Sequence, residues 1–213
     1  MAIGAGALLV VVAAGVLLGG GAFGPRASPS PSPTTVAAAS NSPGVSPTQD
    51  VFPNAAETAL LRALPPDLRQ TCSRGPYDEV QAEQGNFATP GASLTCSPGI
   101  ASGANEVVAR TFTQRTGSTV NGDFNTESAI SYIMGSRGLR PGDCATHTRV
   151  GGRWMLNAVD VGAIACFVDS TTGDAVLYWS YRDAFVLIRA TNQRGDSTAL
   201  YAYFQSIARF ISP

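Results

Sequence analysis

Four cysteines are the feature that most restricts how this chain can fold, and they stand at Cys72, Cys96, Cys144 and Cys166. An even number of cysteines that follows an apolar N-terminal segment is typical of disulfides formed in an oxidising compartment. A zinc site would need closely spaced ligand pairs such as CxxC, and the chain contains none. Cys144 and His147 have ligand spacing, but they are one pair without a second. The sequence therefore predicts two disulfides, with no metal site and no cofactor.

The N-terminal quarter of the chain reads as a membrane anchor and a linker. Residues 2–24 carry no charged side chain, which satisfies the requirement of roughly 20 apolar residues for a membrane-spanning helix. A cleaved secretory signal is the alternative, since Gly20 and Ala22 are small enough to precede a cleavage site. Residues 25–50 are dominated by Pro, Ser, Thr, Ala and Gly, which predicts a disordered linker.

The expected organisation is therefore a transmembrane anchor at 1–24, a linker at 25–50 and a disulfide-bonded domain at 51–213. Disulfides require an oxidising compartment, so residues 25–213 should lie outside the cytoplasm. The expected location is the cell membrane with a single span, and the alternative is secretion.

Several features recur at a spacing of about 70 residues. Cys72 and Cys144 are 72 positions apart, and Cys96 and Cys166 are 70 apart. Helix-like starts at 57–60, 127–130 and 197–200 are also separated by 70 positions. This spacing predicts two similar α-β-β-β units followed by a closing helix. If each unit is self-contained, then of the three connectivities open to four cysteines the expected one joins Cys72 to Cys96 and Cys144 to Cys166.

Local patterns predict an α+β fold with an antiparallel sheet of about six strands and helices packed on one face. Apolar periodicity, caps and proline stops indicate helices over 55–64 and 126–134 and a last helix from about residue 197. Alternating and β-branched segments indicate strands at 92–96, 107–113, 154–159, 162–168, 175–181 and 185–190.

Five segments together resemble a known family of domains. They are LLRALPPDLRQTC, SLTCSPG, GDCATHTRVGGRW, GAIACFVDSTTGDAVLYWSY and LYAYF, between Leu60 and Phe204. They resemble the extracytoplasmic C-terminal domain of bacterial transmembrane Ser/Thr protein kinases and of related single-span proteins from high-GC bacteria. The resemblance implies an outward-facing sensor or binding domain. The chain lacks the HRD, DFG and VAIK motifs of a kinase domain, so the resemblance does not extend to kinase activity.

Three function classes follow from these features. The leading one is a membrane-anchored extracytoplasmic sensor that binds an unidentified extracellular ligand or envelope protein. A structural or interaction module of the cell envelope is the alternative.

A secreted hydrolase is a weaker third class. His147 is the only histidine, Asp143 and Asp160 are its only evident partners, and no GxSxG motif supplies a serine. Glycosidase-type carboxylate pairs are not singled out by the spacing of Glu79, Glu83, Glu106 and Asp123. We therefore assign no catalytic residue, and a net charge of -1 argues against a nucleic-acid partner.

The aromatic segment 177–181 suggests where a ligand would bind. Alternation along a strand sends Leu177, Trp179 and Tyr181 to one face of the sheet and Tyr178 to the other. If the second face is open, the residues expected to form an apolar patch for a ligand or partner are Val176, Tyr178, Val186 and Ile188. The competing and more ordinary interpretation is a sheet that is covered on both sides.

Overall fold

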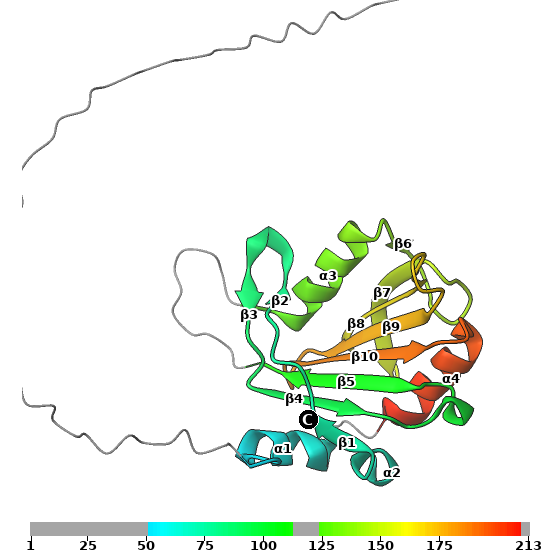
Figure 1. Ribbon diagram of the computed structural model, residues 1–213. Helices are drawn as coiled ribbons and strands as arrows, with labels where there is room; N and C mark the ends of the chain where they lie inside the picture. Colours follow the sequence, from blue (N-terminus) through cyan, green and yellow to red (C-terminus); the bar gives the residue numbers. More distant parts are fainter. Residues whose placement is uncertain (1–50, 113–123, 210–213) are drawn as a thin grey trace, which may run out of the picture. The chain divides into compact units, whose positions relative to one another are not determined.

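The computed structural model of the protein describes residues 51–112 and 124–209. They form a mixed α+β domain with four α-helices, an eight-stranded sheet and a two-stranded hairpin (Figure 1). The predicted fold class is therefore confirmed, although the sheet has more strands than expected. The predicted membrane span and linker lie outside the described residues. Within 51–112 and 124–209, no helix is long and apolar enough to cross a bilayer.

The large sheet has the strand order β1-β4-β5-β10-β9-β8-β7-β6, and all its pairs are antiparallel except β6 with β7. The helices are α1 (Ala55–Ala63), α2 (Pro66–Arg69), α3 (Thr126–Ser136) and α4 (Ser197–Ile207). The strands of the large sheet are β1 (Cys72–Arg74), β4 (Ala92–Cys96), β5 (Glu106–Thr111), β6 (Arg140–Pro141), β7 (Val150–Leu156), β8 (Val159–Val168), β9 (Ala175–Tyr181) and β10 (Val186–Asn192). The separate hairpin consists of β2 (Val80–Gln81) and β3 (Phe87–Ala88).

Helices cover both faces of the sheet, which corrects the expectation of a single covered face. On one face, α1 and α4 enclose the main core, in which Trp179, Ile188 and Phe204 are buried. On the other face, α3 and the β2–β3 hairpin enclose a smaller cluster that includes Ile130 and Leu187 (Figure 1). The central strand β9 is buried along almost its whole length, so apolar groups on both its sides need a cover.

The two halves of the domain form opposite ends of the sheet. The predicted units contribute β1-β4-β5 at one end and β9-β8-β7 at the other, with β10 between them. Because β5 and β9 are both antiparallel to β10, corresponding strands of the two ends run in the same direction but in reversed order. A rotation about an axis along the strands would relate two such ends, and it would place their helices on opposite faces of the sheet. α1 packs on β4 and β5 within the main core, and α3 packs on β8 and β9 from the opposite side, so the predicted repeat stays a prediction.

The cysteine pairing is the one predicted. Cys72 is bonded to Cys96 and Cys144 to Cys166, with sequence separations of 24 and 22. The first bridge joins directly opposed residues of β1 and β4. The second ties the loop that precedes β7 to β8. Both bridges close short local loops, so each helps to hold one flank of the sheet.

The second bridge can be removed on its own. Replacing Cys144 by Ser should expose one thiol at Cys166, leave Cys72 bonded to Cys96, and lower the free energy of unfolding by roughly 3 kcal/mol on the chain-entropy model. Thiol titration in denaturant, peptide mapping without reductant and urea unfolding measure these three effects. A peptide that links Cys72 to Cys144 or Cys166 would contradict the pairing.

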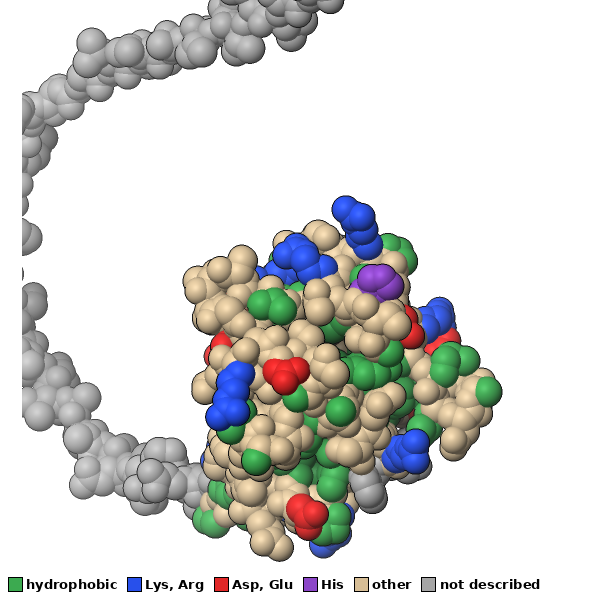
Figure 2. Space-filling model, turned by 90° about the vertical axis from the view of Figure 1, so that its right-hand side faces the viewer, with side chains coloured by type: hydrophobic (Ala, Val, Ile, Leu, Met, Phe, Trp, Pro, Cys, Tyr) green, Lys and Arg blue, Asp and Glu red, His purple; other side chains and the backbone are tan. Residues whose placement is uncertain are grey.

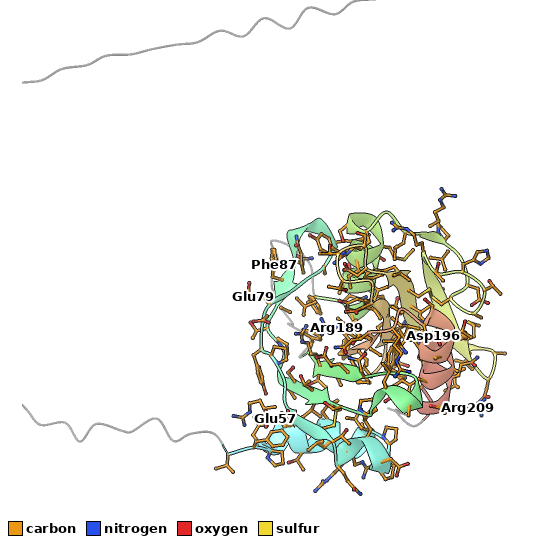
Figure 3. The ribbon with its side chains drawn as sticks, turned by 45° about the vertical axis from the view of Figure 1, so that its right-hand side comes forward. Glu57, Glu79, Phe87, Arg189, Asp196 and Arg209 are labelled. Carbon is orange, nitrogen blue, oxygen red and sulfur yellow. A yellow bond between two sulfur atoms is a disulfide. The ribbon has the colours of Figure 1, made fainter. Side chains whose placement is uncertain are left out.

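A buried carboxylate joins α1 to the edge of the sheet. Glu57 is fully buried at the start of α1 and completes a capping box with Asn54. The carboxylate of Glu57, which Figure 3 labels, also accepts hydrogen bonds from Arg74 at 2.6 and 3.0 Å and from the Tyr77 hydroxyl at 2.9 Å. The Arg74 hydrogen bond, partly opposed by burial, lowers the pKa of Glu57 from 4.5 to about 2.

This lowered pKa makes the stability of the domain depend on pH. Because the pKa is lower in the folded state, the Glu57 contribution is complete above about pH 4.5 and is lost as the pH falls toward 2. Glu57→Gln should lower the free energy of unfolding at pH 7 by roughly 3 kcal/mol and flatten its pH dependence in that window. Urea unfolding at several pH values tests this, with the exposed Glu83→Gln as control. A variant whose pH profile matches that of the parent would contradict the assigned role.

Candidate functional site

The structure separates the four residues that were expected to form one patch. Val186 and Ile188 pair with Tyr181 and Trp179 across the β9–β10 ladder, and paired residues share a face of the sheet. Both are therefore buried in the main core, and their assignment to a ligand face was wrong. Val176 and Tyr178 lie on the opposite face, which α3 covers only in part.

A surface cavity of about 340 Å³ lies over this second face, and we call it the Tyr178 cavity. Its floor comes from one end of strands β5, β8, β9 and β10, and Arg137 at the end of α3 forms part of its wall. The β8–β9 turn forms the rim. The lining residues are Asn105, Glu106, Arg137, Phe167, Asp169, Thr172, Asp174, Val176, Tyr178, Arg189, Thr191 and Gln193.

Stacked planar groups form one side of the Tyr178 cavity. The rings of Phe167 and Tyr178 are nearly parallel, with centroids 6.3 Å apart. The guanidinium of Arg137 lies 5.1 Å from the centroid of the Phe167 ring and donates a 3.1 Å hydrogen bond to Asp169. Backbone N–H groups of the β8–β9 turn, with Arg137, lower the pKa of Asp169, so this carboxylate is ionised at neutral pH. Asp169 thereby holds the planar, positively charged guanidinium of Arg137 over the Phe167 ring.

A second charged pair crosses the floor between β5 and β10. Arg189 is hydrogen-bonded to Glu106, and both side chains are a little over one-third exposed. The Nε–H group of Arg189 is buried and has no hydrogen-bond partner among residues 51–112 and 124–209. Figure 3 labels Arg189, which pairs with Tyr178 in the β9–β10 ladder and so shares its face of the sheet. The ion pair with Glu106 therefore leaves the Nε–H donor of Arg189 without an acceptor among the described residues.

Arg110 stands beside this pair on β5. It is half-buried, its Nε–H group is also buried without a partner, and it forms no ion pair with any residue that the structure describes. Burial and the neighbouring positive charge of Arg189 lower the pKa of Arg110, while Tyr178 and Asp78 oppose that shift. Sequence reasoning missed Arg110 and Arg189. The available signal was a charged residue within each of two otherwise apolar strands.

The residues considered for hydrolysis are not gathered into a catalytic arrangement. His147 is exposed, and its Nδ1 lies 2.7 Å from the hydroxyl of the adjacent Thr146 (Figure 2, purple). Asp160 is ion-paired with Arg153 and Arg182, and Asp143 accepts the backbone N–H of Ala145 within its own loop. Among the described residues, no group of three His, Cys, Asp or Glu side chains is placed to hold a metal ion.

A second cavity, of about 460 Å³, lies between α4 and the β7–β8 turn. Trp154, Tyr201 and Phe204 contribute to its wall, and Arg209 stands at the end of α4 (Figure 3). Met155 and Val159 at the nearby turn are 56% and 61% exposed. Figure 2 shows apolar side chains at the surface on this side of the molecule. Among the residues that the structure describes, no two that line this second cavity form an ion pair.

The Tyr178 cavity therefore has an aromatic surface, two arginine–carboxylate pairs, and in Arg189 an Nε–H group without a partner among the described residues, on a scaffold held by two disulfides. Such a combination suits non-covalent binding of a small ligand, because an apolar surface supplies affinity and a few convergent polar groups fix orientation. Comparison with models of protein families, with curated proteins and with solved structures found no match to this chain.

Proposed function

We propose that residues 51–213 are an extracytoplasmic ligand-binding domain of the sensor type, and that the ligand binds in the Tyr178 cavity. The observation that carries this proposal is the convergence of Phe167, Tyr178, Arg137 and Arg189 around one cavity. These side chains come from α3, β8, β9 and β10, so a ligand would contact elements distant in sequence. No enzymatic activity is part of the proposal.

The location outside the cytoplasm rests on the disulfides. The two bridges together use all four cysteines of the chain, and disulfide bonds persist in oxidising compartments. The apolar stretch at 2–24 and the Pro/Ser-rich stretch at 25–50 have the composition of an anchor and a stalk, which would hold the domain away from the membrane surface. The resemblance to the outer domains of transmembrane Ser/Thr kinases agrees with a sensor role.

An envelope-interaction module is the second candidate. The exposed side chains of Met155 and Val159 beside the second cavity favour it, because apolar groups at a hairpin tip can bury themselves against another protein. This candidate places the contact surface at α4 and the β7–β8 turn. It is therefore distinguishable from the first by where binding perturbs the domain.

The proposed topology predicts the behaviour of the chain in a bacterial host. If residues 2–24 remain as an anchor, the protein should stay in the membrane fraction after salt and carbonate washing. Protease added to intact cells should then release a disulfide-bonded fragment of about residues 51–213. Recovery of only a soluble form that begins near Phe23 would instead show cleavage of a signal.

The proposed site can be mapped with soluble fragments of cell-envelope glycans and peptides. Nuclear magnetic resonance titration of the disulfide-bonded domain should shift the backbone amides of Val176, Tyr178 and Arg189. Tyr178→Ala should weaken binding about tenfold, since it removes one aromatic wall of the cavity, a loss of about 1.4 kcal/mol.

Tyr201→Ala, at the second cavity, is the matched control and should leave that affinity unchanged. Shifts confined to residues 154–159 and 201–208, with loss of binding in Tyr201→Ala alone, would replace the sensor proposal by the interaction module.

A further inference from the structure

We infer that the ligand of the Tyr178 cavity carries a carboxylate group, and that Arg110 and Arg189 bind it. This inference rests on the proposed function, since it specifies the chemistry of the ligand at the same site. It follows from the register of β5 and β10 and from the unused hydrogen-bond donors of the two arginines.

The register places both guanidinium groups on one face of the sheet. Arg110 is opposite Leu187, and Arg189 is opposite Val108, so the two arginines are diagonal neighbours across the β5–β10 pair. Diagonal neighbours on one face lie about 7–8 Å apart, within reach of side chains as long as arginine. Arg189 lines the cavity, and Arg110 lies one step further along the ladder toward the cluster around Leu187.

The arrangement is electrostatically unfavourable without a ligand. The neighbouring charges repel, and burial adds to the destabilisation of the Arg110 cation. Glu106 is ion-paired with Arg189, whereas Arg110 forms no ion pair among residues 51–112 and 124–209, and Asp78 offsets its positive charge only in part. A buried N–H group without a partner destabilises the fold, and a charged one does so more strongly. An oxyanion bound between the two groups would supply both the missing acceptors and the missing charge.

The other charges of the cavity favour a single carboxylate over more highly charged groups. Glu106 and Asp169 also line it, each paired with an arginine, and Asp174 lies on the rim without an ion-pair partner among the described residues. These three carboxylates would repel a dianion such as phosphate more strongly than a monoanion. A planar carboxylate also matches the planar donors of arginine. The adjacent Phe167 and Tyr178 rings would contact an apolar or flat part of the same ligand.

Benzoate is the appropriate probe, with benzamide as its neutral analogue of the same shape. Both are titrated into the purified full-length chain while the arginine Nε–H resonances are followed by nuclear magnetic resonance. Benzoate should shift the signals of Arg110 and Arg189 with a dissociation constant of about 1 mM, a reasonable value for so small a ligand. Benzamide should bind at least tenfold more weakly. This comparison needs no variant, so it holds even if a substitution disturbs the fold.

The variant arm assigns the effect to Arg110. Arg110→Lys keeps the charge but removes the planar donor group, so benzoate affinity should fall about tenfold or more. Arg194→Gln, an exposed arginine outside the cavity, should leave it unchanged. Thermal unfolding of each variant establishes that its fold is retained.

Four results would overturn the inference. Equal binding of benzamide and benzoate at the cavity would show a ligand site without carboxylate recognition. Inorganic phosphate that binds as tightly as benzoate would show a general anion site. If envelope fragments shift the Tyr178 resonance while benzoate shifts the resonances of neither arginine, the proposed function stands and the inferred carboxylate group of the ligand is rejected. Failure of every probe and every fragment at the cavity would remove the proposed function as well.

Discussion

The antiparallel pairing of β5 with β10 is the interaction on which the rest of the structure depends. It joins residues 106–111 to residues 186–191, which are about 80 positions apart, and unites the strands of the two halves in one sheet. Its register places Ile188 opposite Ala109 in the main core and Arg189 opposite Val108 on the other face. A shift by one residue would exchange these faces, burying charge among apolar residues and exposing the apolar ones. The core and the candidate site are thus specified by the same alignment.

A pairing between such distant segments has a high entropic cost, so other contacts must hold each half in shape. In the first half, the Cys72–Cys96 bridge and the Glu57–Arg74 ion pair join α1 and β1 to the flank of the sheet. In the second, the Cys144–Cys166 bridge holds the loop before β7, and the Trp154 indole donates a hydrogen bond to the Ser180 carbonyl. Each of these contacts lies within one half of the domain and does not involve the β5–β10 pair. They leave the central face over β5, β10 and β9 to carry the polar groups of the Tyr178 cavity.

The sequence was informative where structure is decided locally. The strands at 92–96 and 175–181 were predicted with their actual ends, because alternation and turn residues mark them. The last helix begins where Asp196 caps it. The cysteine pairing was also right, because each bridge closes a short loop within one of the predicted units. β1 and β6 have three and two residues, too few to leave a periodic pattern.

The candidate site was predicted only in part because it depends on register between distant strands. Tyr178 and Val176 were placed correctly from alternation within β9. Val186 and Ile188 were not, since the parity of β10 relative to β9 is fixed by their hydrogen-bond ladder and has no local signature. The same holds for Arg110 and Arg189, which become neighbours only when β5 meets β10. One-dimensional patterns give the face of a residue within its strand, whereas a site requires the faces of several strands to be aligned.

This dependence on alignment gives the proposed sensor a physical means of response. A ligand at the Tyr178 cavity would contact β8, β9, β10 and the end of α3 at once, and its carboxylate would also contact β5 through Arg110. In the ligand-free domain, the adjacent arginines oppose the pairing that brings them together. Binding would remove that opposition and stabilise the β5–β10 junction by an amount that grows with ligand concentration. The group that recognises the ligand would thus also weaken the free domain at its central contact.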